Sequence, residues 1–193
     1  MLGKQAKVLS AAQARAVLTH LTTTRNPLRN RVIFLLSIRA GLRAKEIAAL
    51  TWSMITDAEG QLTDTIRLTD AAAKGSTGGV IPMARDLATA LGAFRLATGS
   101  AELGTPVIVT ERSKKTSAQV IINLFGGWYR GLGFEGCSSH SGRRTFITNA
   151  ARNIGRFGGS LRDVQALARH ASLATTQRYI EVNGAAIRLV VDL

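Results

Sequence analysis

Apolar residues recur with helical spacing over most of the chain. The stretch "SAAQ" (residues 10–13) has the spacing of a capping box, which predicts that a first helix begins there. Asn26 and Pro27 have the character of an N-cap and a first helical position, and Gly41 is placed to end the same helix. Similar spacing predicts further helices over about 44–50, 86–98 and 117–132, after His140 and after Ser160.

The pattern changes in the middle of the chain. The segments "DTIRL" and "GGVIPM" alternate, contain β-branched residues, and flank the small-residue stretch "TDAAAKGSTGG". They predict a small antiparallel sheet. No repeat, low-complexity run or linker interrupts the sequence, so we expect one domain over residues 1–193. Its predicted class is α+β, mainly α, with the sheet at one edge.

Length and composition narrow the class of protein. The chain has 193 residues, of which 46% are hydrophobic, and this is ample for a buried core. The longest apolar run, "VIFLLSI", is too short to span a bilayer, and no signal-peptide pattern follows Lys4 and Lys7. Cys137 is the single cysteine, so no internal disulfide can form. The sequence therefore predicts a cytoplasmic protein with no membrane partner.

Charge is unevenly distributed along the chain, whose formal net charge is +13. Residues 1–45 hold nine Lys and Arg and no acid, residues 46–111 hold four basic against eight acidic residues, and residues 112–193 hold twelve against four. Segregated positive charge is typical of a surface that binds a polyanion. We therefore predict a nucleic-acid partner, whereas charge serving only solubility would need neither this excess nor an acid-free start.

Several short motifs carry phosphate chemistry. His140 and Arg143 lie three residues apart at a predicted helix start, on one face and beside unpaired backbone N–H groups. Arg43 follows a glycine at the start of another short helix, where packing would hold it for bidentate phosphate recognition. His170 and Tyr179 flank "TT" in "ARHASLATTQRYI". Each motif alone has an ordinary explanation as a solvated helix face or a core residue.

Together, and in this order, the motifs resemble the catalytic domain of the tyrosine recombinases, or phage integrases, over nearly the whole chain. The segment "AGLRAKEIAALTWSMI" resembles the first-arginine segment of that family, and "VIPM" its return strand after the hairpin lysine. "HSGRRTFITNAA" resembles the second-arginine box, and "LARHASLATTQRYI" the segment with the last histidine and the nucleophile. The resemblance implies double-stranded DNA as the partner, nucleoid association when bound, and a homotetramer on DNA.

The resemblance also implies a set of catalytic residues: Arg43, Lys74, His140, Arg143, His170 and Tyr179. Tyr179 would attack a DNA phosphodiester to give a 3′-phosphotyrosine and a free 5′-hydroxyl. Arg43 and Arg143 would hold the non-bridging oxygens. His140 would accept or relay the phenol proton, and His170 would hydrogen-bond the phosphate. Lys74 would protonate the departing 5′-oxygen. Because phosphotyrosine preserves the energy of the broken bond, no ATP, metal or other cofactor is expected.

The sequence departs from the family pattern in several places. Arg169 stands where the family usually has glycine, and Gly142 where an apolar residue is common. The hairpin "KGSTGGVIP" lacks the additional basic residues often found there, which predicts a weaker grip on DNA. Relatives usually carry a helical core-binding domain before the catalytic one. Only about nine residues precede the first predicted helix here, so the expectation is that this domain is absent.

Other functions remain open at this point. Type IB topoisomerases share the catalytic residues, and a DNA-binding regulator derived from an integrase would share the fold. Cys137, His140 and His170 could in principle ligate zinc, although the neighbouring arginines disfavour a cation. The apolar tail after Asn183 and Gly184 could pack either on its own domain or on a neighbouring subunit.

Overall fold

A computed structural model of the chain describes residues 5–73, 78–99, 102–110, 113 and 115–179. The chain forms two compact units, residues 1–146 and residues 147–193. The boundary falls inside a helix, α6 (Ser141–Asn153), after Phe146.

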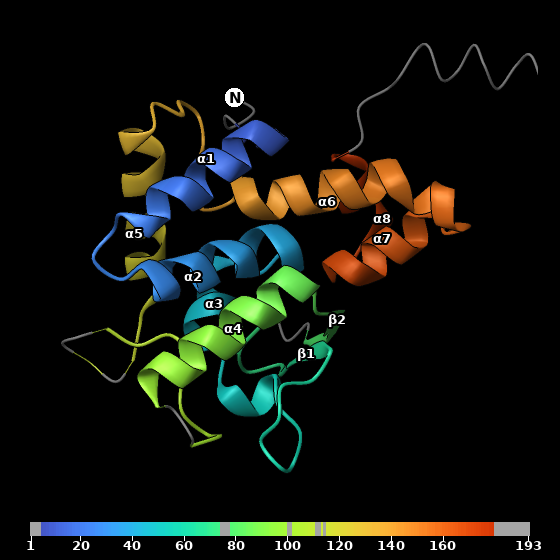
Figure 1. Cartoon of the computed structure of the whole chain (residues 1–193). Helices are drawn as coiled ribbons and strands as arrows, with labels where there is room; N and C mark the ends of the chain where they lie inside the picture. Colours follow the sequence, from blue (N-terminus) through green and yellow to red (C-terminus); the bar gives the residue numbers. More distant parts are fainter. Residues whose placement is uncertain (1–4, 74–77, 100–101, 111–112, 114, 180–193) are drawn as a thin grey trace, which may run out of the picture. The chain divides into compact units, whose positions relative to one another are not determined.

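The first unit is mostly helical and is built around one apolar helix. Its elements are α1 (Ala11–Thr22), α2 (Pro27–Ala40), α3 (Ala44–Ala49), the 3-10 helix η1 (Trp52–Met54), β1 (Thr65–Leu68), β2 (Gly79–Pro82), α4 (Arg85–Thr98), α5 (Ala118–Gly131) and the first turns of α6. Helices α1, α3 and α4 all pack against α2 (Figure 1). The run from Val32 to Leu36 is buried on every side of α2, as expected for a helix that is apolar all round.

The ends of the first two helices confirm the predictions from sequence. The Ser10 hydroxyl accepts a hydrogen bond from the Gln13 N–H, and the Gln13 side chain accepts one from the Ser10 N–H, at 3.1 and 2.9 Å. Pro27 occupies the first position of α2, although the side chain of Asn26 makes no capping hydrogen bond. Gly41 ends α2 in the left-handed conformation, with φ of 64°.

The predicted sheet is also present. Strands β1 and β2 pair antiparallel, with Thr65 opposite Pro82 and Leu68 opposite Gly79. Ile66 and Ile81 face each other in this register, and both are buried. The mainly helical class with a small antiparallel sheet is therefore confirmed. Lys74 belongs to the stretch 74–77, which lies outside the described residues.

The second unit contains the rest of α6, followed by η2 (Ile154–Phe157), α7 (Leu161–Ala168) and α8 (Leu173–Gln177). The helix predicted after Ser160 is present as α7 and begins with a capping box, in which the Asp163 carboxylate accepts hydrogen bonds from the backbone N–H and the hydroxyl of Ser160. Helix α8 was not predicted from the sequence. It is a single short turn of five residues that leads directly to Tyr179.

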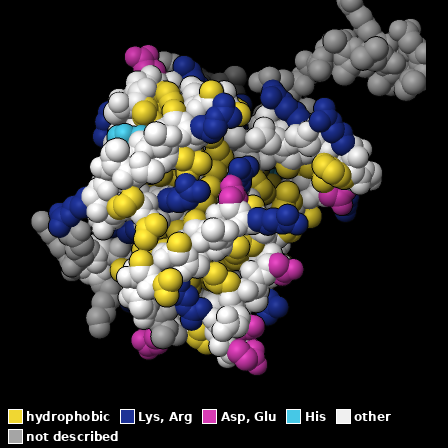
Figure 2. All heavy atoms as spheres, in the orientation of Figure 1, with side chains coloured by type: hydrophobic (Ala, Val, Ile, Leu, Met, Phe, Trp, Pro, Cys, Tyr) yellow, Lys and Arg dark blue, Asp and Glu magenta, His cyan; other side chains and the backbone are white. Residues whose placement is uncertain are grey.

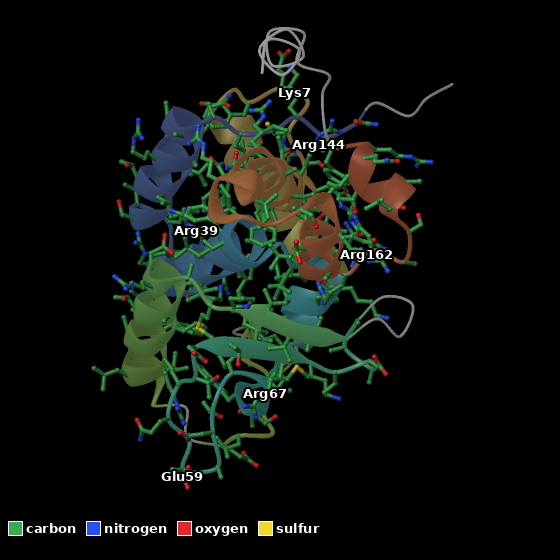
Figure 3. The ribbon with its side chains drawn as sticks, turned by 90° about the vertical axis from the view of Figure 1, so that its right-hand side faces the viewer. Lys7, Arg39, Glu59, Arg67, Arg144 and Arg162 are labelled. Atoms are coloured by element: carbon green, nitrogen blue, oxygen red, sulfur yellow. The ribbon has the colours of Figure 1, made fainter. Side chains whose placement is uncertain are left out.

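Charged side chains follow the segregation found in the sequence. On the face of the first unit drawn in Figure 2, Lys and Arg side chains lie over the helices, and several Asp and Glu side chains gather towards the lower edge. Glu59 lies at this edge in Figure 3, below Arg67 of the hairpin. No helix in the described ranges has both the length and the apolar character needed to cross a membrane.

Candidate active site

Arg43 is held at the corner between α2 and α3. It is the N-cap residue of α3, and its backbone N–H donates to one carboxylate oxygen of Glu46 at 2.8 Å. Its guanidinium donates to the other oxygen of the same carboxylate, also at 2.8 Å. Glu46 is completely buried, whereas the side chain of Arg43 is 23% exposed. One buried carboxylate therefore orients an arginine that still reaches the surface.

Arg143 comes to the same corner from the first turn of α6. Its side chain is buried, with 4% exposure, and its Nη1 donates to the carbonyl of Gly41 at 2.6 Å. Gly41 lies two residues before Arg43, so the two predicted phosphate-binding arginines flank one short backbone segment. A charged donor on a buried carbonyl forms a strong hydrogen bond. The contact fixes the position of Arg143 in the first unit.

Two glycines allow this close approach. A Cβ atom at Gly142 would collide with the Ser37 hydroxyl of α2, and a Cβ atom at Gly41 would lie 2.5 Å from Cδ1 of Phe146. No side chain larger than hydrogen fits at Gly142 without moving α2 or α6. The departure from the family pattern at this position thus has a local packing reason, the close contact with Ser37.

His140 precedes α6 and is exposed. Its backbone N–H donates to the Ser138 hydroxyl at 3.3 Å, and its carbonyl accepts from the Arg144 N–H at 2.9 Å. The amino-terminal segment supports this start of α6. The Leu9 N–H donates to the Thr145 hydroxyl at 2.8 Å. In Figure 3, Lys7 of this segment lies at the same end of the molecule as Arg144.

The second unit brings His170 and Tyr179 together. Their rings are stacked, with centroids 5.5 Å apart and an interplanar angle of 26°. The Tyr179 N–H donates to the carbonyl of Thr176 at 3.0 Å, and the Tyr179 carbonyl accepts from the Thr148 hydroxyl at 3.4 Å. His170 is 9% exposed and Tyr179 is half-buried. The predicted nucleophile is thus fixed beside a histidine while part of its side chain stays accessible.

Two residues that contact His170 were missed in the sequence. Thr176 is fully buried, and its hydroxyl oxygen lies 2.9 Å from Nδ1 of His170. The Gln165 carbonyl accepts from the His170 N–H at 3.1 Å, and the Gln165 side-chain amide donates to the His170 carbonyl at 3.0 Å. The sequence did offer a signal for Thr176, which is the second threonine of "TT". It is a polar residue placed only a few positions from both His170 and Tyr179.

The other tyrosine has a different environment. Tyr129 lies in the core of the first unit, where its ring stacks on Phe125 with centroids 5.9 Å apart. Burial raises the pKa of Tyr129, and the neighbouring Cys137 raises it further. The phenol of Tyr129 is therefore kept protonated and away from solvent. Of the two tyrosines, Tyr179 alone has the accessibility that a nucleophile needs.

The structure thus groups four of the predicted residues into two pairs, Arg43 with Arg143 in the first unit and His170 with Tyr179 in the second. His140 belongs to the first unit, three residues before Arg143. Lys74 lies outside the described residues. Within the described ranges, no group of three or more His, Cys, Asp or Glu side chains could hold a metal ion, the zinc ligands considered above included.

The sequence matches known proteins along most of its length. Residues 7–185 match the model of the phage integrase family. A tyrosine recombinase XerC of Pelobacter propionicus is 27% identical over 177 residues, which are 91% of this chain and 55% of that protein. A tyrosine recombinase XerC of Rhizobium meliloti is 30% identical over 166 residues, 85% of this chain and 49% of that protein. The chain spans about half the length of these curated relatives.

Solved structures show the same fold. A XerA recombinase superposes with a TM-score of 0.73 at 23% identity, over 98% of this chain and 64% of that chain. A Tn1549 transposon integrase in complex with a circular intermediate DNA gives a TM-score of 0.73 at 17% identity, over 97% of this chain and 66% of that chain. At these identities the likeness shows a common fold.

Proposed function

Because the chain belongs to the phage integrase family, we propose that it is the catalytic domain of a site-specific DNA recombinase. In this proposal, residues 1–193 cleave and rejoin strands of double-stranded DNA through a 3′-phosphotyrosine intermediate. The observation that carries it is the contrast between the two tyrosines. Tyr179 is half-buried and stacked on a histidine, whereas Tyr129 is buried and stacked on Phe125.

The arginines supply the electrostatic part of the reaction. Attack on a phosphodiester places additional negative charge on the non-bridging oxygens, and fixed guanidinium groups stabilise this charge without reorganisation. The Glu46 carboxylate orients Arg43, and the Gly41 carbonyl orients Arg143. We propose that both guanidinium groups bind the oxygens of the scissile phosphate. This preorganisation supports their role in the transition state rather than in binding alone.

The bond changes balance without an external cofactor. The Tyr179 oxygen forms a bond to phosphorus as the bond from phosphorus to the 5′-oxygen breaks. The phenol proton passes to His140, the 5′-oxygen takes a proton from Lys74, and His170 hydrogen-bonds the phosphate. Attack by a 5′-hydroxyl on the phosphotyrosine then runs the same steps in reverse. Rejoining to a different strand gives recombination, which we propose takes place in a homotetramer on DNA.

Trapping the covalent intermediate tests the proposal. The protein is incubated with nicked suicide DNA, from which the cleaved strand end diffuses away, and the products are separated under denaturing conditions. We expect a protein–DNA adduct with the natural sequence and none with Tyr179→Phe. The variant keeps the aromatic ring that stacks on His170, so it should still bind DNA.

Tyr129→Phe is the matched control. The Tyr129 hydroxyl is buried and makes no hydrogen bond within the described part of the chain, so its removal should leave the core intact and the adduct yield unchanged. An adduct formed by Tyr179→Phe, or lost in Tyr129→Phe while the fold is retained, would contradict the assignment. DNA binding by the natural sequence without any adduct would favour a non-catalytic regulator.

A further inference from the structure

Thr176 connects the two predicted catalytic residues of the second unit. Its hydroxyl oxygen lies 2.9 Å from Nδ1 of His170, and its carbonyl accepts a hydrogen bond from the Tyr179 N–H at 3.0 Å. The residue is fully buried. A buried hydroxyl that meets an imidazole nitrogen at this distance replaces water as the partner of that nitrogen. The contact can therefore determine which nitrogen of the His170 imidazole carries the proton.

The backbone of His170 is fixed independently of this contact. Gln165 accepts from the His170 N–H through its carbonyl and donates to the His170 carbonyl through its side chain, at 3.1 and 3.0 Å. The ring stacks on Tyr179 on one face. With the backbone and the ring plane held, the remaining variable is which ring nitrogen carries the proton of the neutral imidazole.

Hydrogen-bond accounting decides between the two tautomers. A threonine hydroxyl is a donor as well as an acceptor, and a buried donor without an acceptor costs roughly 1–3 kcal/mol. Within the described residues, the Thr176 hydroxyl makes no hydrogen bond other than the one with Nδ1 of His170. Its proton is satisfied when Nδ1 accepts, and this requires the proton of the neutral ring to sit on Nε2. The opposite tautomer would leave the hydroxyl proton without an acceptor.

We infer that Thr176 is a positioning residue, which holds neutral His170 as the Nε2–H tautomer and so presents Nε2 as a hydrogen-bond donor. The tautomer is inferred independently of the proposed function. The role of Nε2–H rests on that function, in which His170 donates a hydrogen bond to an oxygen of the DNA phosphate. If the ring takes a second proton during the reaction, the hydroxyl can rotate and accept from Nδ1–H, at the cost of leaving its own proton without an acceptor among the described residues. The same contact then orients the ring in both protonation states.

The tautomer can be measured without DNA. Long-range ¹H–¹⁵N correlation spectra of protein labelled at histidine distinguish protonated from unprotonated ring nitrogens. The chain has three histidines, so single His→Asn variants assign the signals of His20, His140 and His170. We expect a protonated Nε2 and an unprotonated Nδ1 for neutral His170. Thr176→Val should shift this residue towards a mixture of tautomers, and a protonated Nδ1 in the natural sequence would overturn the inference.

Two variants control for packing. Thr176→Ser retains the hydroxyl and should keep the tautomer of the natural sequence. Thr175→Val removes the neighbouring hydroxyl, which contacts Ser172 at 3.1 Å instead of the histidine, and should leave the His170 signals unchanged. An unchanged His170 spectrum in folded Thr176→Val would also overturn the inference.

Single-turnover cleavage of suicide DNA tests the purpose. A misplaced donor typically slows a reaction by on the order of 10- to 100-fold, so Thr176→Val should lose about this much while Thr176→Ser and Thr175→Val stay near the natural rate. A changed tautomer with an unchanged rate would refute the positioning role. If the natural sequence forms no adduct, the proposed function fails, but the spectra still decide the tautomer.

Discussion

Arg169 ends α7 in a backbone conformation that suits glycine. Its φ of 54° and ψ of 47° make it the one residue other than glycine with positive φ in the described ranges. A left-handed residue with a Cβ atom costs roughly 1–2 kcal/mol. Strain of this kind is concentrated beside functional sites, and Arg169 directly precedes His170. The family's usual glycine at this position is explained by the conformation.

Comparison of two substitutions at this residue separates the backbone from the side chain. Arg169→Ala and Arg169→Gly both remove the guanidinium, but only Arg169→Gly relieves the strain. We expect the glycine variant to be more stable than the alanine variant by about 1 kcal/mol, the reverse of the order in a helix interior. Urea unfolding followed by circular dichroism measures the difference. Equal stability would mean that position 169 is not left-handed in solution.

At the scale of elements, the start of α7 depends on one acidic residue. Asp163 has its pKa lowered from the ordinary value of 3.8, first because its carboxylate accepts from the Ser160 N–H and then because it accepts from the Ser160 hydroxyl. The group is exposed, so the effect is local. Because the pKa of Asp163 is lower in the folded chain than in the unfolded chain, the cap stabilises α7 fully at pH values above the ordinary pKa of aspartate. This stabilisation is lost as the pH falls through the lowered pKa of the folded chain.

An NMR titration of the Asp163 carboxyl carbon checks this sign. Its midpoint should lie below 3.8 in the natural sequence. In Ser160→Ala the hydroxyl bond is lost and the backbone bond remains, so the midpoint should rise but stay below that of an unpaired aspartate. A midpoint at or above 3.8 in the natural sequence would show that the cap is not formed in solution.

The candidate site also depends on the close contact between α2 and the start of α6, where Gly142 meets Ser37. Gly142→Ala places a methyl group against Ser37 and should destabilise the fold by about 1–3 kcal/mol, as overpacking does. Because this shift also moves Arg143, cleavage of suicide DNA should fall with stability. The measurement is the urea midpoint together with the adduct yield.

A double-mutant cycle with Ser37→Gly tests whether Gly142→Ala acts through this collision. It removes the hydroxyl that Gly142→Ala would meet, so the alanine should be much less damaging in the double variant than in the single one. The Ser37 hydroxyl is buried and makes no hydrogen bond in the described part of the chain. Additive effects in the double-mutant cycle would refute the predicted collision.

At the scale of the whole molecule, the net charge of +13 is the feature most relevant to a DNA partner. Lys45 of α3 and Lys115, just before α5, line one pocket of about 340 Å³ in the first unit. Arg130 lies at the opposite end of α5, roughly 20 Å away along a helix of this length. These three residues allow the contribution of one surface to be separated from that of net charge.

Salt titrations of DNA affinity make the separation. Affinity should fall steeply with salt, because each neutralised phosphate releases counterions. Lys45 lies two residues after Arg43, and Lys115 lines the same pocket as Lys45. If each of these lysines contacts one phosphate, Lys45→Ala and Lys115→Ala should each reduce the slope of log K against log salt by about one. Arg130→Ala changes the net charge equally and should leave the slope unchanged. Equal effects of all three would mean that binding follows net charge alone.

Most of the helices and both strands could be predicted from the sequence because their signals are local. Ser10, Pro27 and Gly41 mark helix ends by chemistry that acts within one turn. Helix α8 escaped prediction because five residues with two adjacent threonines have neither the length nor the propensity of a helix. It is stabilised by its neighbours, including the contact of Thr176 with His170.

The family, and the types and order of the predicted catalytic residues, could be read from the sequence alone, since they depend on motifs within short windows. The contacts that hold these residues could not be read in this way. Arg143 and Gly41 are 102 residues apart in the chain, and Gly142 meets Ser37 across two helices. Neither contact leaves a periodic signal, because such partners are selected by the packing of the finished core and not by the propensities of their own segments.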